Sequence, residues 1–162
     1  MALPIFILLL TGTIEFGFLY NNLLTVQFSA RMGVTAAAEA GATDGADCAI
    51  LKAVEAGLSL PVDRSKVTQV EVFESDAAGD PIPDRINTYV RSGTLDCGLT
   101  TQPYTLVGAE GYPQTERKDS LAAGLEVVGV RVGYLYEGIT PVGSGRTWML
   151  SDGATLRMEP KQ

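Results

Sequence analysis

The chain has 162 residues, of which 46% are hydrophobic, and a formal net charge of −7. A chain of this length holds one long helix and one small domain, and its negative charge argues against a nucleic-acid partner. The sequence contains no histidine, which excludes a Ser-His-Asp or Cys-His pair and a histidine general base. Composition therefore favours a structural or binding protein over an enzyme.

Residues 1–30 contain no Lys or Arg, and Glu15 is their only charged residue. Large apolar residues occur on all sides of the predicted helix, so it must be buried in lipid or in other protein. Thirty helical residues reach ~45 Å, more than the ~30 Å hydrocarbon thickness of a bilayer. The segment is therefore predicted to cross a membrane.

Glu15 distinguishes this helix from a plain membrane anchor, because a carboxylate in hydrocarbon costs a few kcal/mol and usually faces a partner. The next fixed cation, Arg31, lies about 24 Å further along a continuous helix, too far for an ion pair. We therefore expect a partner for Glu15 from another chain. Small and polar residues that allow close helix approach support this: Thr11, Gly12, Thr13, Gly17, Asn21, Asn22 and Thr25. A plain anchor and a cleaved secretory signal remain as alternatives, although no basic leader is evident.

The helix is predicted to continue through the Ala-rich residues 31–39 and to break at residues 41–45, where Asp44 or Asp47 could cap the next helix. Residues 46–58 predict a second, amphipathic helix lying against a sheet, because their large apolar positions share one helical face. These positions are Ile50, Leu51, Val54 and Leu58.

The remainder predicts strands and loops. Strands are expected at residues 66–73, 85–90, 125–136, 146–150 and 155–158, with a turn at 151–153 joining the last two. Residues 75–83, 93–111 and 112–119 are predicted loops. The fold class is therefore α+β: a long N-terminal hydrophobic helix, a second amphipathic helix and a small antiparallel sheet. We expect an assembly helix over residues 1–40 and a globular extracytoplasmic domain over residues 41–162.

Cys48 and Cys97 form an even pair in a chain that has the character of an exported protein. Paired, they would close a loop of about fifty residues and constrain the unfolded chain by roughly 4 kcal/mol. We favour a structural disulfide over two buried thiols. The lack of a C-x-x-C spacing argues against a zinc or redox site.

Two other patterns resemble ligand sites weakly. Residues 143–147 resemble a phosphate loop but lack its Gly-Lys-Ser/Thr ending, so a hairpin loop is favoured. Asp76, Asp80 and Asp84 could hold calcium but lack the twelve-residue spacing of a calcium loop, so a solvated acidic loop is favoured. No cofactor or resident metal is predicted.

Residues 3–17, LPIFILLLTGTIEFG, resemble the signature of TadE-like pseudopilins, the minor subunits of tight-adherence (Flp-type) pili. The shared features are a Pro, a run of large aliphatics, a Gly and then Ile-Glu-Phe-Gly. The family has a basic leader, a prepilin-peptidase site and a glutamate before this signature, so we expect this chain to begin inside the motif. At the other end, GLEVVGVRVGYLYEGITPV and WMLSDGATLRMEP are similar to the family's closing strands.

The resemblance implies a pilin-like structural subunit of an extracellular filament for adhesion, major or minor. It would insert in the inner membrane before assembly and then pack with copies of itself or with related pilin subunits. The expected assembly residues are Leu3, Pro4, Leu8, Gly12, Glu15, Phe16 and Gly17. Two alternatives are a monomeric membrane-anchored extracytoplasmic domain that binds a ligand or envelope partner, and a pilus-assembly accessory protein. A hydrolase would need a carboxylate pair such as Glu110 with Glu116, which nothing in the sequence positions.

Overall fold

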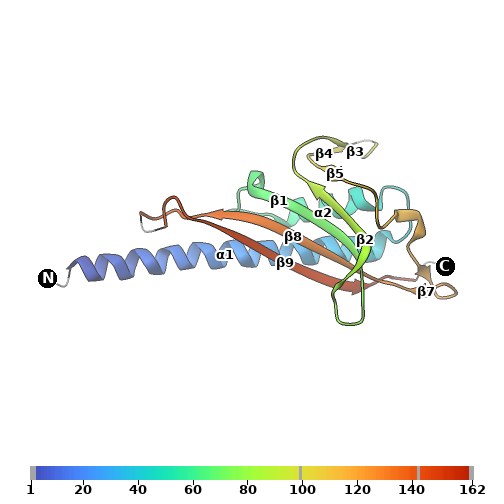
Figure 1. The fold of residues 1–162 in the computed structure, drawn as a ribbon, viewed down its shortest axis with the longest axis horizontal. Helices are drawn as coiled ribbons and strands as arrows, with labels where there is room; N and C mark the ends of the chain where they lie inside the picture. Colours follow the sequence, from blue (N-terminus) through green and yellow to red (C-terminus); the bar gives the residue numbers. More distant parts are fainter. Residues whose placement is uncertain (1–2, 99, 142, 161–162) are drawn as a thin grey trace.

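The fold is a five-stranded antiparallel sheet with two helices on one face, in a computed structural model that describes residues 3–98, 100–141 and 143–160. The first helix runs along the molecule and projects beyond the sheet at its amino end (Figure 1). The predicted α+β class, with a long apolar helix, a second helix and a small antiparallel sheet, is confirmed.

Helix α1 (Leu3–Ala40) has two differently packed halves. Its carboxyl half contributes Val26, Ala30, Val34 and Ala37 to the core, all almost completely buried. Its Ala-rich sequence allows this close packing: a Cβ at Gly33 would lie 2.6 Å from Cγ2 of Val54. The predicted assembly helix thus supplies part of the globular core.

Helix α2 (Ala46–Gly57) lies beside α1 and ends where the two helices touch, since a Cβ at Gly57 would lie 2.6 Å from Cα of Ser29. The predicted apolar face is confirmed, because its four large residues are all buried: Ile50, Leu51, Val54 and Leu58. The predicted cap is wrong. Gly45, in the left-handed conformation, occupies the N-cap position without a side-chain hydrogen bond.

The sheet has the strand order β5-β2-β1-β8-β9. Its strands are β1 (Val67–Ser75), β2 (Pro81–Val90), β5 (Thr105–Val107), β8 (Val127–Glu137) and β9 (Thr147–Arg157). Alternate valines of β1 and β8 point toward the helices and are fully buried: Val70, Val72, Val128, Val130 and Val132. The predicted common face of the three β8 valines is confirmed.

Two strands are longer than predicted. The expected turn at residues 151–153 is wrong: β9 is continuous, and Ser151, Asp152 and Gly153 pair with β8 like their neighbours. Turn-forming residues lie in a strand here because β8 offers an unbroken partner along its whole length. Strand β2 starts at Pro81 rather than at residue 85, and its first half pairs only with β1, so prolines are tolerated at this open edge.

Two of the predicted loops are wrong in part, because residues 93–111 contain β5 of the main sheet and residues 75–83 end inside β2. The remaining elements, in or near the predicted loops, are short: η1 (Arg64–Lys66), β3 (Leu95–Asp96), β4 (Thr101–Gln102), η2 (Gln114–Glu116), β6 (Asp119–Ser120) and β7 (Gly124–Leu125). Strands β3 and β4 form a small separate hairpin, as do β6 and β7. The absence of a long hydrophobic period in these segments is therefore consistent with the structure.

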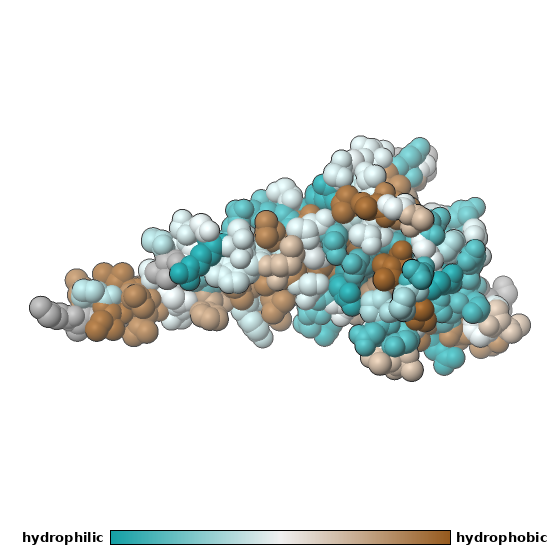
Figure 2. Space-filling view, viewed as in Figure 1, coloured by the Kyte–Doolittle hydropathy of each residue, from teal (hydrophilic) through white to brown (hydrophobic). Residues whose placement is uncertain are grey.

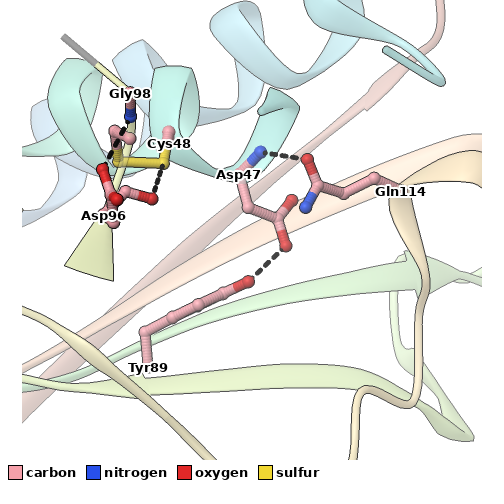
Figure 3. The surroundings of a disulfide bond; sticks show 7 residues. Asp47, Cys48, Tyr89, Asp96, Gly98 and Gln114 are labelled. Carbon is pink, nitrogen blue, oxygen red and sulfur yellow. Dashed lines mark hydrogen bonds between the residues drawn. A yellow bond between two sulfur atoms is a disulfide. The ribbon is translucent and has the colours of Figure 1, made fainter. Parts of the chain in front are cut away.

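The disulfide between Cys48 and Cys97 is present, with its Cα atoms 5.8 Å apart. It joins α2 to the segment between β3 and β4, two parts of the chain 49 residues apart (Figure 3). The predicted structural role is consistent with this position, because the β3–β4 hairpin lies outside the main sheet.

We expect the Cys48→Ser/Cys97→Ser variant to lose up to about 4 kcal/mol of unfolding free energy, because the unfolded chain gains the freedom of the closed loop. Guanidinium denaturation measures this difference. A reducing agent should shift the wild-type midpoint and leave that of the variant unchanged. Equal midpoints of the oxidised wild type and the variant would contradict the structural role of the bond.

Candidate assembly site on the first helix

The amino end of α1 is a bare apolar rod. Every residue from 3 to 10, which we call the bare segment, is exposed, with Leu3 70% and Leu8 60% accessible. Figure 2 shows hydrophobic side chains gathered around this projecting end. The helix Leu3–Ala40 is long and apolar enough to cross a membrane. Such a surface is stable only when lipid or protein covers it.

The predicted assembly residues are exposed on this rod, except for Glu15, which is buried, and Gly12, which is half-buried beside the β8–β9 connection. Pro4 lies in the first turn of the described helix, and Phe16 is 75% exposed. A Cβ placed on Gly12 or on Gly17 would meet no atom within 4 Å. Both glycines therefore leave room for another helix to approach the backbone closely.

The exposed apolar surface continues along the packed half of α1. Phe16, Tyr20, Leu24 and Phe28 recur every four residues and are all exposed. They therefore follow one face of the helix, which we call the outer stripe. Val26 and Ala30 lie on the opposite side of the helix and are fully buried. Core packing thus covers one side of α1 and leaves the outer stripe bare.

The partner of Glu15 lies within the same chain, so the expected partner from another chain is wrong for this carboxylate. Glu15 is only 8% exposed. It accepts a hydrogen bond from the Tyr136 hydroxyl at 2.6 Å and from the backbone N–H of Thr140 at 2.8 Å. The N–H of Ile139 also points at the carboxylate, 3.1 Å from Oε1. We call these four residues the Glu15 clamp.

The connection between β8 and β9 shapes the clamp. Thr140 turns the chain sharply, because its carbonyl accepts the N–H of both Gly143, at 3.0 Å, and Ser144, at 2.7 Å. A Cβ at Gly143 would lie 2.7 Å from the carboxyl carbon of Glu15, so only glycine lets the turn approach so closely. Burial and the neighbouring carboxylate raise the pKa of Tyr136, which keeps its hydroxyl protonated as a donor.

Trp148, the single tryptophan, extends the clamp region toward the outer surface. Its ring lies 5.8 Å from that of Tyr136, and it lines a small cleft together with Glu15, Phe16 and Leu19. The tip of the β8–β9 hairpin is therefore held against α1 beside exposed apolar residues.

We expect Glu15→Ala to lower the free energy of unfolding by about 1–3 kcal/mol, because it leaves buried donors without an acceptor. Hydrogen exchange should also show a loss of protection at the amides of Ile139 and Thr140. Glu39→Ala, the same change at an exposed position of the same helix, is the matched control and should have no such effect. Unchanged protection in the Glu15 variant would contradict the clamp.

A second buried polar cluster lies at the other end of the domain, around Asp47 of α2. Its carboxylate forms an ion pair with Arg117 and accepts hydrogen bonds from Asn87, at 2.9 Å, and Tyr89. The backbone N–H of Asp47 donates to the Gln114 side chain at 3.1 Å (Figure 3). The cluster thus connects α2, β2 and the segment before β6.

Arg117 is completely buried, although residues 112–119 read as a polar loop. Its guanidinium lies 4.6 Å from the centre of the Tyr112 ring, and its Nε and Nη1 have no hydrogen-bond partner among the described residues. A buried positive charge is strongly destabilising without a counter-charge, and Asp47 provides the counter-charge of Arg117. No local pattern marks this pair, since its two residues are 70 positions apart.

We expect Asp47→Ala to cost about 3–5 kcal/mol of unfolding free energy, because it leaves Arg117 buried without a counter-charge. Asp44→Ala, at an exposed position just before the same helix, is the control and should stay within about 0.5 kcal/mol of wild type. Adding Arg117→Met to Asp47→Ala should recover part of the loss. Urea denaturation of wild type, Asp47→Ala, Arg117→Met and the double variant checks the cycle, and additive effects would argue against coupling.

The weaker ligand patterns have structural roles. Oδ1 of Asp76 accepts the backbone N–H groups of Ala78 and Asp80, which closes the turn between β1 and β2. Within the described part of the chain, no group of three or more acidic, cysteine or histidine residues could hold a metal. Of the residues that resemble a phosphate loop, 143–146 lie in the connection between β8 and β9, and Thr147 is the first residue of β9. Glu116 pairs with Arg85 at 3.1 Å.

The fold and this surface define an α+β protein with a projecting apolar helix fixed to its own sheet. Comparison with protein-family models, with curated proteins and with solved structures finds no match.

Proposed function

We propose that this protein is a structural subunit of a pilus-like filament, a pilin or pseudopilin, that assembles through α1. The observation that carries the proposal is the bare segment together with the outer stripe, an apolar surface that the chain's own fold leaves uncovered. In the membrane the bare segment would contact lipid. In a filament, helices of other copies or of related subunits would replace the lipid. The TadE-like signature at residues 3–17 supports the same function.

Packing rather than hydrophobicity would favour the filament over the membrane, since lipid tails are as apolar as leucine. Close approach of helices then matters most, and the open surfaces at Gly12 and Gly17 allow it. A contact between the bare segment of one copy and the outer stripe of another would be head-to-tail. Contacts of this kind that do not close into a ring produce open helical filaments.

The globular part would face solvent. Its disulfide and the acidic charge of the chain suit an oxidising compartment outside the cytoplasm. We therefore propose a subunit that resides in the inner membrane before assembly and on the cell surface afterwards, with adhesion as its purpose. The Glu15 clamp would fix the direction in which α1 leaves the sheet, so that every copy presents the same rod.

One observation favours a second function, a monomeric membrane-anchored extracytoplasmic binding domain. Because Glu15 is satisfied within its own chain, a lone helix in lipid carries no unmet carboxylate. A solitary anchor is then energetically acceptable, and for α1 the two functions differ in whether the helix contacts lipid or other helices.

Leucine at both glycines distinguishes the two functions. We expect Gly12→Leu/Gly17→Leu to abolish filaments in electron micrographs, because the larger side chains hold neighbouring helices apart. Membrane attachment in vesicle flotation should not change, since the substitutions only add apolar surface. Ala56→Leu, on the exposed face of α2, adds similar bulk to the globular part and should leave filaments intact.

Wild-type protein that remains monomeric in lipid under all assembly conditions would overturn the filament proposal and favour the anchored domain. Filaments that form normally with both glycines replaced would overturn the proposed close helix packing.

A further inference from the structure

The tip of the β8–β9 hairpin, which we define as residues 138–141 and 143–146, differs in charge from the rest of this acidic protein. Between Glu137 and Asp152 the sequence contains a single charged residue, Arg146, which is exposed. Glu137 itself pairs with Lys66 at 2.9 Å. Ile139 at the tip is 61% exposed although its backbone N–H is fixed by Glu15. The tip thus combines an exposed cation with an exposed large apolar side chain.

The hairpin tip is also placed next to the apolar rod. It reaches along α1 toward the amino terminus, ahead of the other strands (Figure 1). Glu15 lies twelve positions after Leu3 in α1, about 18 Å of rise against the ~30 Å hydrocarbon core of a bilayer. The exposed apolar surface does not stop at Glu15, because Phe16 and Tyr20 continue it. Lipid that covers the bare segment therefore comes close to the tip.

Trp148 lies two positions after the tip, as the second residue of β9, and lines the cleft beside Phe16. Tryptophan favours the headgroup level of a bilayer, where its ring is apolar and its N–H can meet polar groups. Arginine at the same level attracts anionic headgroups. The clamp supplies hydrogen-bond donors for Glu15 from within the chain. Placing this part of α1 near the headgroups therefore leaves no carboxylate without a partner.

We propose that the hairpin tip docks on an anionic lipid surface, with Ile139 and Trp148 at headgroup level and Arg146 facing lipid phosphates. The domain would then rest on the membrane in one orientation before any assembly. This inference requires α1 to enter the bilayer, and it does not require a filament.

Trp148 is a clean reporter because the chain has no other tryptophan. We would reconstitute the full chain, at a low protein-to-lipid ratio, in vesicles of phosphatidylcholine and phosphatidylglycerol. Lipids brominated near the headgroup should quench Trp148 more than lipids brominated near the chain ends, and aqueous iodide should quench it little. Ile139→Glu should reverse this, with loss of shallow bromolipid quenching and a gain of iodide quenching.

Leu121→Glu is the matched control, since Leu121 is 78% exposed and lies between β6 and β7 at the opposite end of the domain (Figure 1). It should leave Trp148 quenching unchanged. Arg146→Glu, which keeps the apolar tip, should weaken shallow quenching in vesicles with phosphatidylglycerol more than in phosphatidylcholine alone.

Three results would overturn the proposal. The first is a wild-type Trp148 that iodide quenches and bromolipids do not. The second is quenching that Ile139→Glu leaves unchanged. The third is protection from iodide that grows with protein concentration instead of with lipid, which would identify a second copy of the chain as the occupant. The quenching measurements do not require filaments, so a protein that forms none could still pass all three. The two proposals can therefore be overturned independently.

Discussion

The hydrogen bonds of the Glu15 carboxylate determine how the two parts of this molecule are related. A carboxylate on an apolar helix must find donors, and here the hairpin tip supplies them from Tyr136, Ile139 and Thr140. The bond network joins residues more than 120 positions apart, which fixes the end of the sheet to the middle of α1. The rod and the globular part therefore form one body instead of a domain on a tether.

The clamp separates two parts of α1 that pack differently. After the clamp, small residues such as Ala30 and Gly33 bring the helix close to the sheet and to α2 and are buried in the core. Before it, large aliphatic residues face outward on all sides and pack against no other part of the described chain. The carboxyl half of α1 thus has the small side chains of a tightly packed core, and its amino end has the large apolar side chains of a helix that is covered by lipid or protein.

Local sequence patterns predicted the elements that depend on local physics. Hydrophobic period identified both helices and the buried face of β8, and cysteine count with spacing indicated the disulfide. Contacts between residues far apart in the sequence could not be predicted. The carboxylate of Glu15 was correctly identified as needing a partner, but no sequence pattern shows that a hairpin 121 residues away provides it. The continuous β9 and the buried Arg117 were missed for the same reason.

In the filament proposed above, the internal partner of Glu15 would change what contacts between subunits must supply. If a neighbour supplied the donors for Glu15, each contact between subunits would carry a charged carboxylate in hydrocarbon, and a lone copy in lipid would leave that carboxylate unsatisfied. With the clamp, the carboxylate of a lone copy is already satisfied, so only shape and apolar contact would favour a neighbouring helix over lipid. In such a filament the open surfaces at Gly12 and Gly17, on different sides of the helix, would influence packing more than the charge of Glu15 does.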